Sequence, residues 1–185
     1  LGNVLRETGR LKEASACYRR ALDLAPDYAE ALYNLAQTLR ELGELEEALE
    51  SFQNVVKIAH DFPEGHNDLS ALLLDLERHQ EAVDGFQRAI ALRPEFAEAH
   101  SNLGNAYTEL GQMEEAIDSY QKALAIRSDL GDVHSNLGYA LWETGKVGES
   151  IESFRKALAI QPSDGKTRHS MGDALLDSGK HKEGL

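Results

Sequence analysis

The sequence repeats itself every 34 residues, and this period constrains the fold more than any other feature. The copy at 97–130 carries two apolar stripes with helical spacing, one on each side of Gly111. The two stripes hold Leu103, Gly104 and Tyr107, then Ala116, Tyr120 and Ala123. One pair of helices cannot bury both stripes, so the copies must stack on one another. The sequence therefore predicts an array of helix pairs.

Equivalent positions in the copies hold residues of matching size. Small residues recur on both helices of each pair, which lets the helix axes approach closely, and one aromatic residue recurs in each second helix. These aromatic residues are Tyr18, Phe52, Phe86, Tyr120 and Phe154. Pro26, Pro94 and Pro162 stand where the second helix of a copy must stop.

The order of these residues resembles the tetratricopeptide repeat family over the whole chain: L-G-x2-Y, then A-x3-F, then Ala and Pro. The resemblance implies an all-α, right-handed solenoid of antiparallel helix pairs, with peptides bound on a concave face lined by the first helices. Glu77 replaces the turn glycine, so we expect a less ideal turn there. His60 and Ser128 replace the proline, so we expect a longer or looser helix end at each.

We expect a single array over residues 1–185. Its complete repeats are 29–62, 63–96, 97–130 and 131–164, and its partial repeats are 1–28 and 165–185, the last cut within its second helix. Neither end resembles a polar capping element, so we expect a fragment of a longer array with exposed apolar ends. Such ends favour end-to-end self-association.

The net charge and the spacing of the histidines limit the classes of partner and ligand. The net charge of −13 argues against nucleic acid and anionic membranes as partners, and it permits basic ones. His66, His100 and His134 recur at the repeat period, but equivalent positions on stacked helices lie about 8–10 Å apart, too far for one metal ion. We expect a structural role for these histidines, no metal, no cofactor and no catalysis. With no signal peptide and no membrane span, the sequence favours a cytoplasmic protein.

One repeat position of the first helices carries Asn34, Asn102 and Asn136, the asparagine ladder, which Asp68 interrupts. This ladder resembles the superhelix of O-linked N-acetylglucosamine transferases, in which asparagines at this position hold a ligand's backbone. An amide offers both donors and an acceptor to a peptide group. The alternative is a set of ordinary exposed or locally bonded asparagines.

A second position carries the acidic ladder, in the last turn of each first helix. Its members are Glu7, Glu41, Asp75, Glu109, Glu143 and Asp177. The helix dipole disfavours a carboxylate there by about 0.3–1 kcal/mol, so the repeated choice indicates another use. Binding of a basic ligand is one such use and a structural ion-pair network is the other; Arg6 and Arg40 offset part of the cost.

Tyr139 and Trp142 share one face of the fifth repeat, as an aromatic anchor for a ligand or as side chains partly buried against the next repeat. Together, these patterns predict a protein–protein interaction module that binds an extended, basic peptide in a concave groove. The competing prediction is the substrate-selecting arm of a larger enzyme such as a glycosyltransferase. A third is a scaffold that assembles through its open ends.

Overall fold

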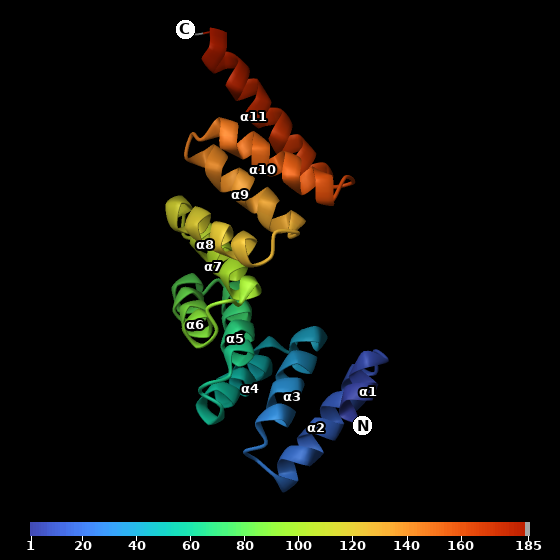
Figure 1. Cartoon of the computed structure of the whole chain (residues 1–185). Coiled ribbons are helices and arrows are strands. Elements are labelled where there is room, and N and C mark those ends of the chain that lie inside the picture. Colours follow the sequence, from blue (N-terminus) through green and yellow to red (C-terminus); the bar gives the residue numbers. More distant parts are fainter. Residues whose placement is uncertain (184–185) are drawn as a thin grey trace. The chain divides into compact units, whose positions relative to one another are not determined.

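The computed structural model describes residues 1–183, with side chains described through Gly179. Every regular element in that part is a helix, which confirms the predicted all-α class (Figure 1). The chain forms two compact units, Leu1–Arg93 and Pro94–Leu185, which we call the first and the second unit. The first unit contains α1 (Gly2–Glu7), α2 (Leu11–Leu24), α3 (Ala29–Leu42), α4 (Leu45–Ile58), α5 (Pro63–Asp75) and α6 (His79–Leu92). The second contains α7 (Ala97–Glu109), α8 (Met113–Ile126), α9 (Gly131–Glu143), α10 (Val147–Ile160) and α11 (Gly165–Glu183).

The helices of each repeat are joined by a tight turn that needs a left-handed residue. Gly111 takes this conformation with φ of 71°, and Gly145 with φ of 78°. Glu77 occupies the equivalent turn with φ of 60°, although it carries a side chain. The left-handed region costs a non-glycine residue about 1–2 kcal/mol, so the less ideal turn predicted at Glu77 is confirmed.

The ends of α4 and α8 differ from the expectation. These helices end at Ile58 and Ile126, the same repeat position at which α6 ends before Pro94, so the expected longer end is wrong. The reason lies in the histidines of the next helix. His66 Nε2 lies 3.1 Å from the His60 carbonyl oxygen, and His134 Nε2 lies 3.0 Å from that of Ser128. His100 makes the same bond to Pro94, so a histidine holds this carbonyl whether or not proline is present.

The last helix also departs from the repeat register. The partial repeat 165–185 is predicted to end within a second helix, but a single helix, α11, runs from Gly165 to Glu183. Residues 184–185 of the predicted partial repeat lie outside the described residues.

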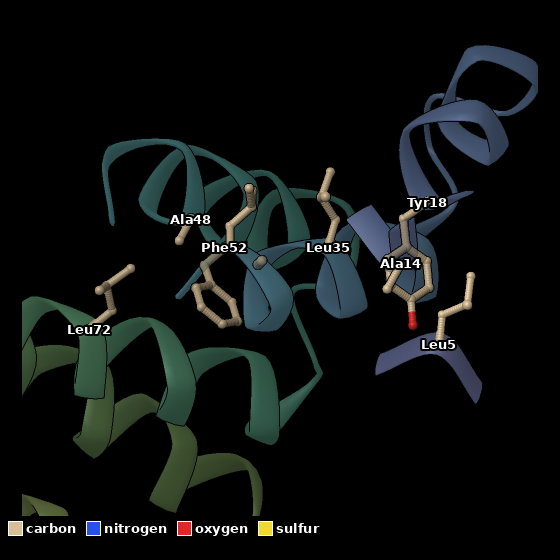
Figure 2. Packing of buried hydrophobic residues seen from close by; sticks show 9 residues of the cluster. Leu5, Ala14, Tyr18, Leu35, Ala48, Phe52 and Leu72 are labelled. Atoms are coloured by element: carbon tan, nitrogen blue, oxygen red, sulfur yellow. The ribbon is translucent and has the colours of Figure 1, made fainter. Parts of the chain in front are cut away.

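The core of each unit runs between the stacked helix pairs. In the first unit it contains Leu5, Ala14, Tyr18, Leu35, Ala48, Phe52 and Leu72 (Figure 2). In the second unit Tyr120 packs with Ala116 and with Leu137 of α9. A Cβ added to Gly104 would lie 2.5 Å from Tyr120 Cε1, so the small residue leaves room for the ring. The predicted pairing of small residues with one aromatic per repeat is confirmed.

Candidate functional site

The exposed face of the first helices in the first unit is crossed by bonds between repeats. Arg6 pairs with Glu41 at 3.5 Å and donates a hydrogen bond to Gln37. The same guanidinium lies 3.5 Å from Asn34 Oδ1, a long contact. Arg40 pairs with Asp75 at 2.6 Å. Asn34 and the acids Glu41 and Asp75 therefore contact arginines of the preceding repeat.

Asp68 interrupts the asparagine ladder because it has partners of its own. Its Oδ2 accepts hydrogen bonds from the Tyr33 hydroxyl at 2.6 Å and from Gln37 Nε2 at 3.0 Å. Burial raises the pKa of Tyr33, and the hydrogen bond to the Asp68 carboxylate raises it further. The hydroxyl thus stays a donor, and a carboxylate is the matching acceptor.

The second unit presents a different face. Helices α7 and α9 contain no lysine or arginine. Glu109 and Glu143 are exposed at their last turns, and no basic side chain in the described part of the chain lies within ion-pair distance of either. Thr108 and Trp142 stand at the repeat position that Arg6 and Arg40 occupy in the first unit. The ladder acids of α7 and α9 therefore keep an uncompensated charge.

The amides of the asparagine ladder stand seven residues before these acids on α7 and α9. Asn102 and Asn136 are both half-buried. Asn136 Nδ2 donates a hydrogen bond to Asn105 Oδ1 at 3.0 Å, and the Tyr120 hydroxyl donates to the same oxygen at 2.9 Å. Asn105 was not among the residues predicted from the sequence to contact a ligand.

A signal for Asn105 was present in the sequence. Asn3 and Asn105 each stand 15 residues before a tyrosine, Tyr18 or Tyr120, and each accepts a hydrogen bond from it. Where a phenylalanine takes the place of the tyrosine, the paired residue is not asparagine. The phenylalanine copies pair Phe52 with Gln37, Phe86 with Ala71 and Phe154 with Tyr139.

The two aromatic candidates separate in the structure. Tyr139 is 39% exposed; partial burial raises its pKa, as does the neighbouring carboxylate of Glu143. Trp142 is half-buried and packs against the cluster that contains Phe154. Its Nε1 donates to Asp177 Oδ2 at 3.0 Å, so the indole contacts the next repeat. Tyr139 is the more available of the two.

Other chemistry is not apparent in the described residues. Among the side chains that the structure describes, through Gly179, no three of His, Cys, Asp or Glu are arranged to hold a metal ion. No helix within residues 1–183 has the length and apolar character needed to cross a bilayer. The face of α7 and α9 offers hydrogen bonding, negative charge and the exposed ring of Tyr139.

Sequence models of tetratricopeptide repeats match most of the chain. A "TPR repeat" model matches residues 2–40, 71–111 and 104–145, and two "Tetratricopeptide repeat" models match 29–62 and 131–164. The chain belongs to the tetratricopeptide repeat family. The arginine–carboxylate pairs and the Asn105–Asn136 pair thus lie on the first helices of a tetratricopeptide repeat protein.

Solved tetratricopeptide structures share this fold. A structure of MamA is 28% identical with a TM-score of 0.82, covering 90% of this chain and 97% of that one. A thermophilic TPR protein of Thermus thermophilus, TTC0263, is 30% identical with a TM-score of 0.71, covering 95% and 96%. YrrB, described as a TPR protein with an unusual peptide-binding site, is 24% identical with a TM-score of 0.78, covering 91% and 87%. The search of curated proteins found no match.

Proposed function

We propose that this tetratricopeptide protein binds an extended, basic peptide along the face of α7 and α9 in its second unit. One observation carries the proposal: Glu109 and Glu143 are exposed, without a basic partner among the described residues, on helices that have no lysine or arginine. The helix dipole disfavours both carboxylates, and a cationic ligand side chain would offset that cost. In the first unit, Arg6 and Arg40 provide the same compensation from within the protein.

The neighbouring side chains suit the rest of such a ligand. The amides of Asn102 and Asn136 offer hydrogen bonds to a peptide backbone with little regard to its side chains. Tyr139 offers a ring face to a lysine or arginine that approaches Glu143, since cations are attracted to aromatic faces. Trp142 contributes apolar surface, with its N–H already bonded to Asp177.

We assign a different role to the equivalent residues of the first unit. Asn34, Glu41 and Asp75 hold adjacent repeats together through Arg6 and Arg40, and they are not peptide contacts in this proposal. The enzyme-arm hypothesis rests on the resemblance of the asparagine ladder, which Asp68 interrupts, so we rank it second. End-to-end self-association is a separate proposal, which sedimentation at several protein concentrations tests.

The spacing of the helices defines a probe peptide. Adjacent packed helices lie about 8–10 Å apart, and an extended chain advances about 3.3 Å per residue. Lysines three residues apart therefore match Glu109 and Glu143. The probe is a fluorescein-labelled decapeptide of Gly and Ala with lysine at every third position, and its control carries glutamate at those positions.

The test compares two charge reversals. Glu109→Lys with Glu143→Lys should weaken binding of the lysine probe about tenfold or more, measured by fluorescence anisotropy, and reduce its salt dependence. The matched control is Glu41→Lys with Asp75→Lys, which changes net charge equally but should leave affinity within about twofold. Equal losses in both variants would show a nonspecific charge effect, and an unchanged first variant would reject the site.

A further inference from the structure

We infer that the Tyr120 hydroxyl positions the amide pair Asn105–Asn136, so that this pair presents one donor and one acceptor to a peptide group of the ligand. Tyr120 is a positioning residue, since it acts through Asn105. The inference rests on the proposed function and names the peptide backbone as the group recognised at this point of the face.

The hydroxyl has a defined direction. Tyr120 belongs to the second helix α8 and its side chain is 1% exposed. Its oxygen lies 2.9 Å from Asn105 Oδ1, and because an amide oxygen can only accept a hydrogen bond, the Tyr120 hydroxyl donates to it. The Thr108 hydroxyl, which donates to the Gly104 carbonyl oxygen at 3.0 Å, also lies 3.1 Å from the Tyr120 oxygen. Burial raises the pKa of Tyr120 to about 12, so the hydroxyl remains a donor at neutral pH.

This bond fixes which atoms of the pair remain available. An amide oxygen accepts two hydrogen bonds, and Asn105 Oδ1 receives them from Tyr120 and from Asn136 Nδ2. What remains is the Asn105 Nδ2 group as a donor and Asn136 Oδ1 as an acceptor, neither of which has a protein partner within the described residues. A peptide group carries one carbonyl and one N–H, which complement this arrangement.

The hydroxyl is not needed for packing. Phe52, Phe86 and Phe154 fill the same repeat position and are 0% exposed without it. In the first unit Tyr18 donates to Asn3 at 2.6 Å, but Asn34 faces Arg6 instead of completing a pair. Tyr18 is therefore a matched control with the same hydrogen bond and no linked amide from the next repeat.

The first test reads the positioning directly. Tyr120→Phe keeps the ring, so the protein should fold and melt within a few degrees of the wild type. The ¹⁵N order parameter of the Asn136 side-chain amide, measured by NMR relaxation, should fall in this variant and stay unchanged in Tyr18→Phe. An unchanged Asn136 order parameter in Tyr120→Phe would overturn the inference, independently of the peptide-binding results.

The second test reads the backbone contact. The lysine probe is compared with the same peptide carrying N-methyl groups on its central backbone nitrogens, which removes the N–H donors. In the wild type and Tyr18→Phe, N-methylation should weaken binding about three- to tenfold, the range of a neutral hydrogen bond. In Tyr120→Phe this ratio should approach one.

The outcomes separate the two proposals. Failure of the unmodified probe to bind the wild type rejects the proposed function, while the NMR measurement still decides the positioning. Equal weakening of both peptides in Tyr120→Phe would show that the hydroxyl acts through stability alone, and would overturn the inference.

Discussion

Each of the two units of this protein has a core of the same kind, and the units differ on the face of their first helices. Both bury an aromatic residue at the same repeat position, with Phe52 in the first unit and Phe154 in the second each 0% exposed. The ladder acids of α3 and α5 are paired with arginines, whereas those of α7 and α9 are not. The repeat period fixes the packing residues and leaves the exposed positions free to diverge.

The acidic-ladder position has different surroundings in the two units. In the first unit a carboxylate and the arginine of the preceding repeat form a contact between repeats, and exposed contacts of this kind contribute about 0–1 kcal/mol each. In the second unit the arginine position holds Thr108 and Trp142, so Glu143 lacks the arginine partner that Glu41 and Asp75 have. A position that is acidic in every repeat thus need not have one function.

The largest expected effect tests whether the cores are equivalent. Phe52→Ala and Phe154→Ala each remove a fully buried ring, which typically costs about 3–5 kcal/mol of stability. Denaturant unfolding, with amide hydrogen exchange to locate the loss in one unit, should give similar values for both variants. If the two losses of unfolding free energy differ by more than about 2 kcal/mol, the cores of the two units are not equivalent.

The next largest effect is expected when the arginine of the first unit is introduced at the equivalent position of the second unit. Thr108→Arg places a guanidinium 35 positions before Glu143, the offset of the pairs Arg6–Glu41 and Arg40–Asp75. The new pair should compensate Glu143 and weaken binding of the lysine probe by about 1 kcal/mol, or roughly fivefold. Arg40→Thr is the reciprocal control: it should cost about 0.2–1 kcal/mol of stability and leave probe binding unchanged. Undiminished affinity in Thr108→Arg would show that the charge of Glu143 is not used.

A smaller effect concerns the turns between helices. The first unit has Glu77 in the left-handed conformation, where the second unit has Gly111 and Gly145. Glu77→Gly removes a strain of about 1–2 kcal/mol and adds unfolded-state entropy worth about 0.5–1 kcal/mol, so the net gain should be about 0.5–1 kcal/mol. Gly111→Glu should lose a similar amount. Denaturant midpoints measure both, and a destabilised Glu77→Gly variant would mean that the Glu77 side chain has a compensating contact.

Much of the fold was predictable because a repeat displays its core many times. The helices, the small residues beside the aromatic rings and the left-handed turn at Glu77 all follow from the 34-residue period. The longer helix ends predicted at His60 and Ser128 are wrong because proline was taken as the stop signal. The hydrogen bond from the following histidine is present at all three ends, with or without proline.

The side-chain contacts on the face of the first helices were predictable only in part. Repeat positions showed where Glu109 and Asn136 lie, but not which side chains meet across adjacent repeats. That depends on rotamers: Arg6 reaches forward to Glu41, although the sequence interpretation used it only to offset charge locally. Asn105 was missed because its pairing with Tyr120 is visible only when the tyrosine and phenylalanine copies are compared.

The smallest expected effect is a pH dependence from two arginine–glutamate contacts of the first unit. Arg10 and Arg78 precede α2 and α6, whereas Gln112 and Lys146 precede α8 and α10. Arg78 Nε donates to Glu81 Oε1 at 2.7 Å, and this hydrogen bond holds the pKa of Glu81 below its ordinary value of 4.5. A carboxylate with a lowered folded pKa stabilises the protein above its unfolded pKa, and this contribution is lost as pH falls through the folded pKa.

Arg78→Gln gives this turn the residue found before α8, so the pKa of Glu81 should rise towards 4.5. A carboxyl-carbon NMR titration of Glu81 measures the shift directly. Arg10→Gln should do the same for Glu13, whose pKa is lowered by the hydrogen bond from Arg10. Both contacts are exposed, so melting at neutral pH should change little, and the difference between variant and wild type should shrink as pH falls below 4.5. Identical titration curves for Glu81 in wild type and variant would show that the arginine contact is absent in solution, and this difference between the two units would then disappear.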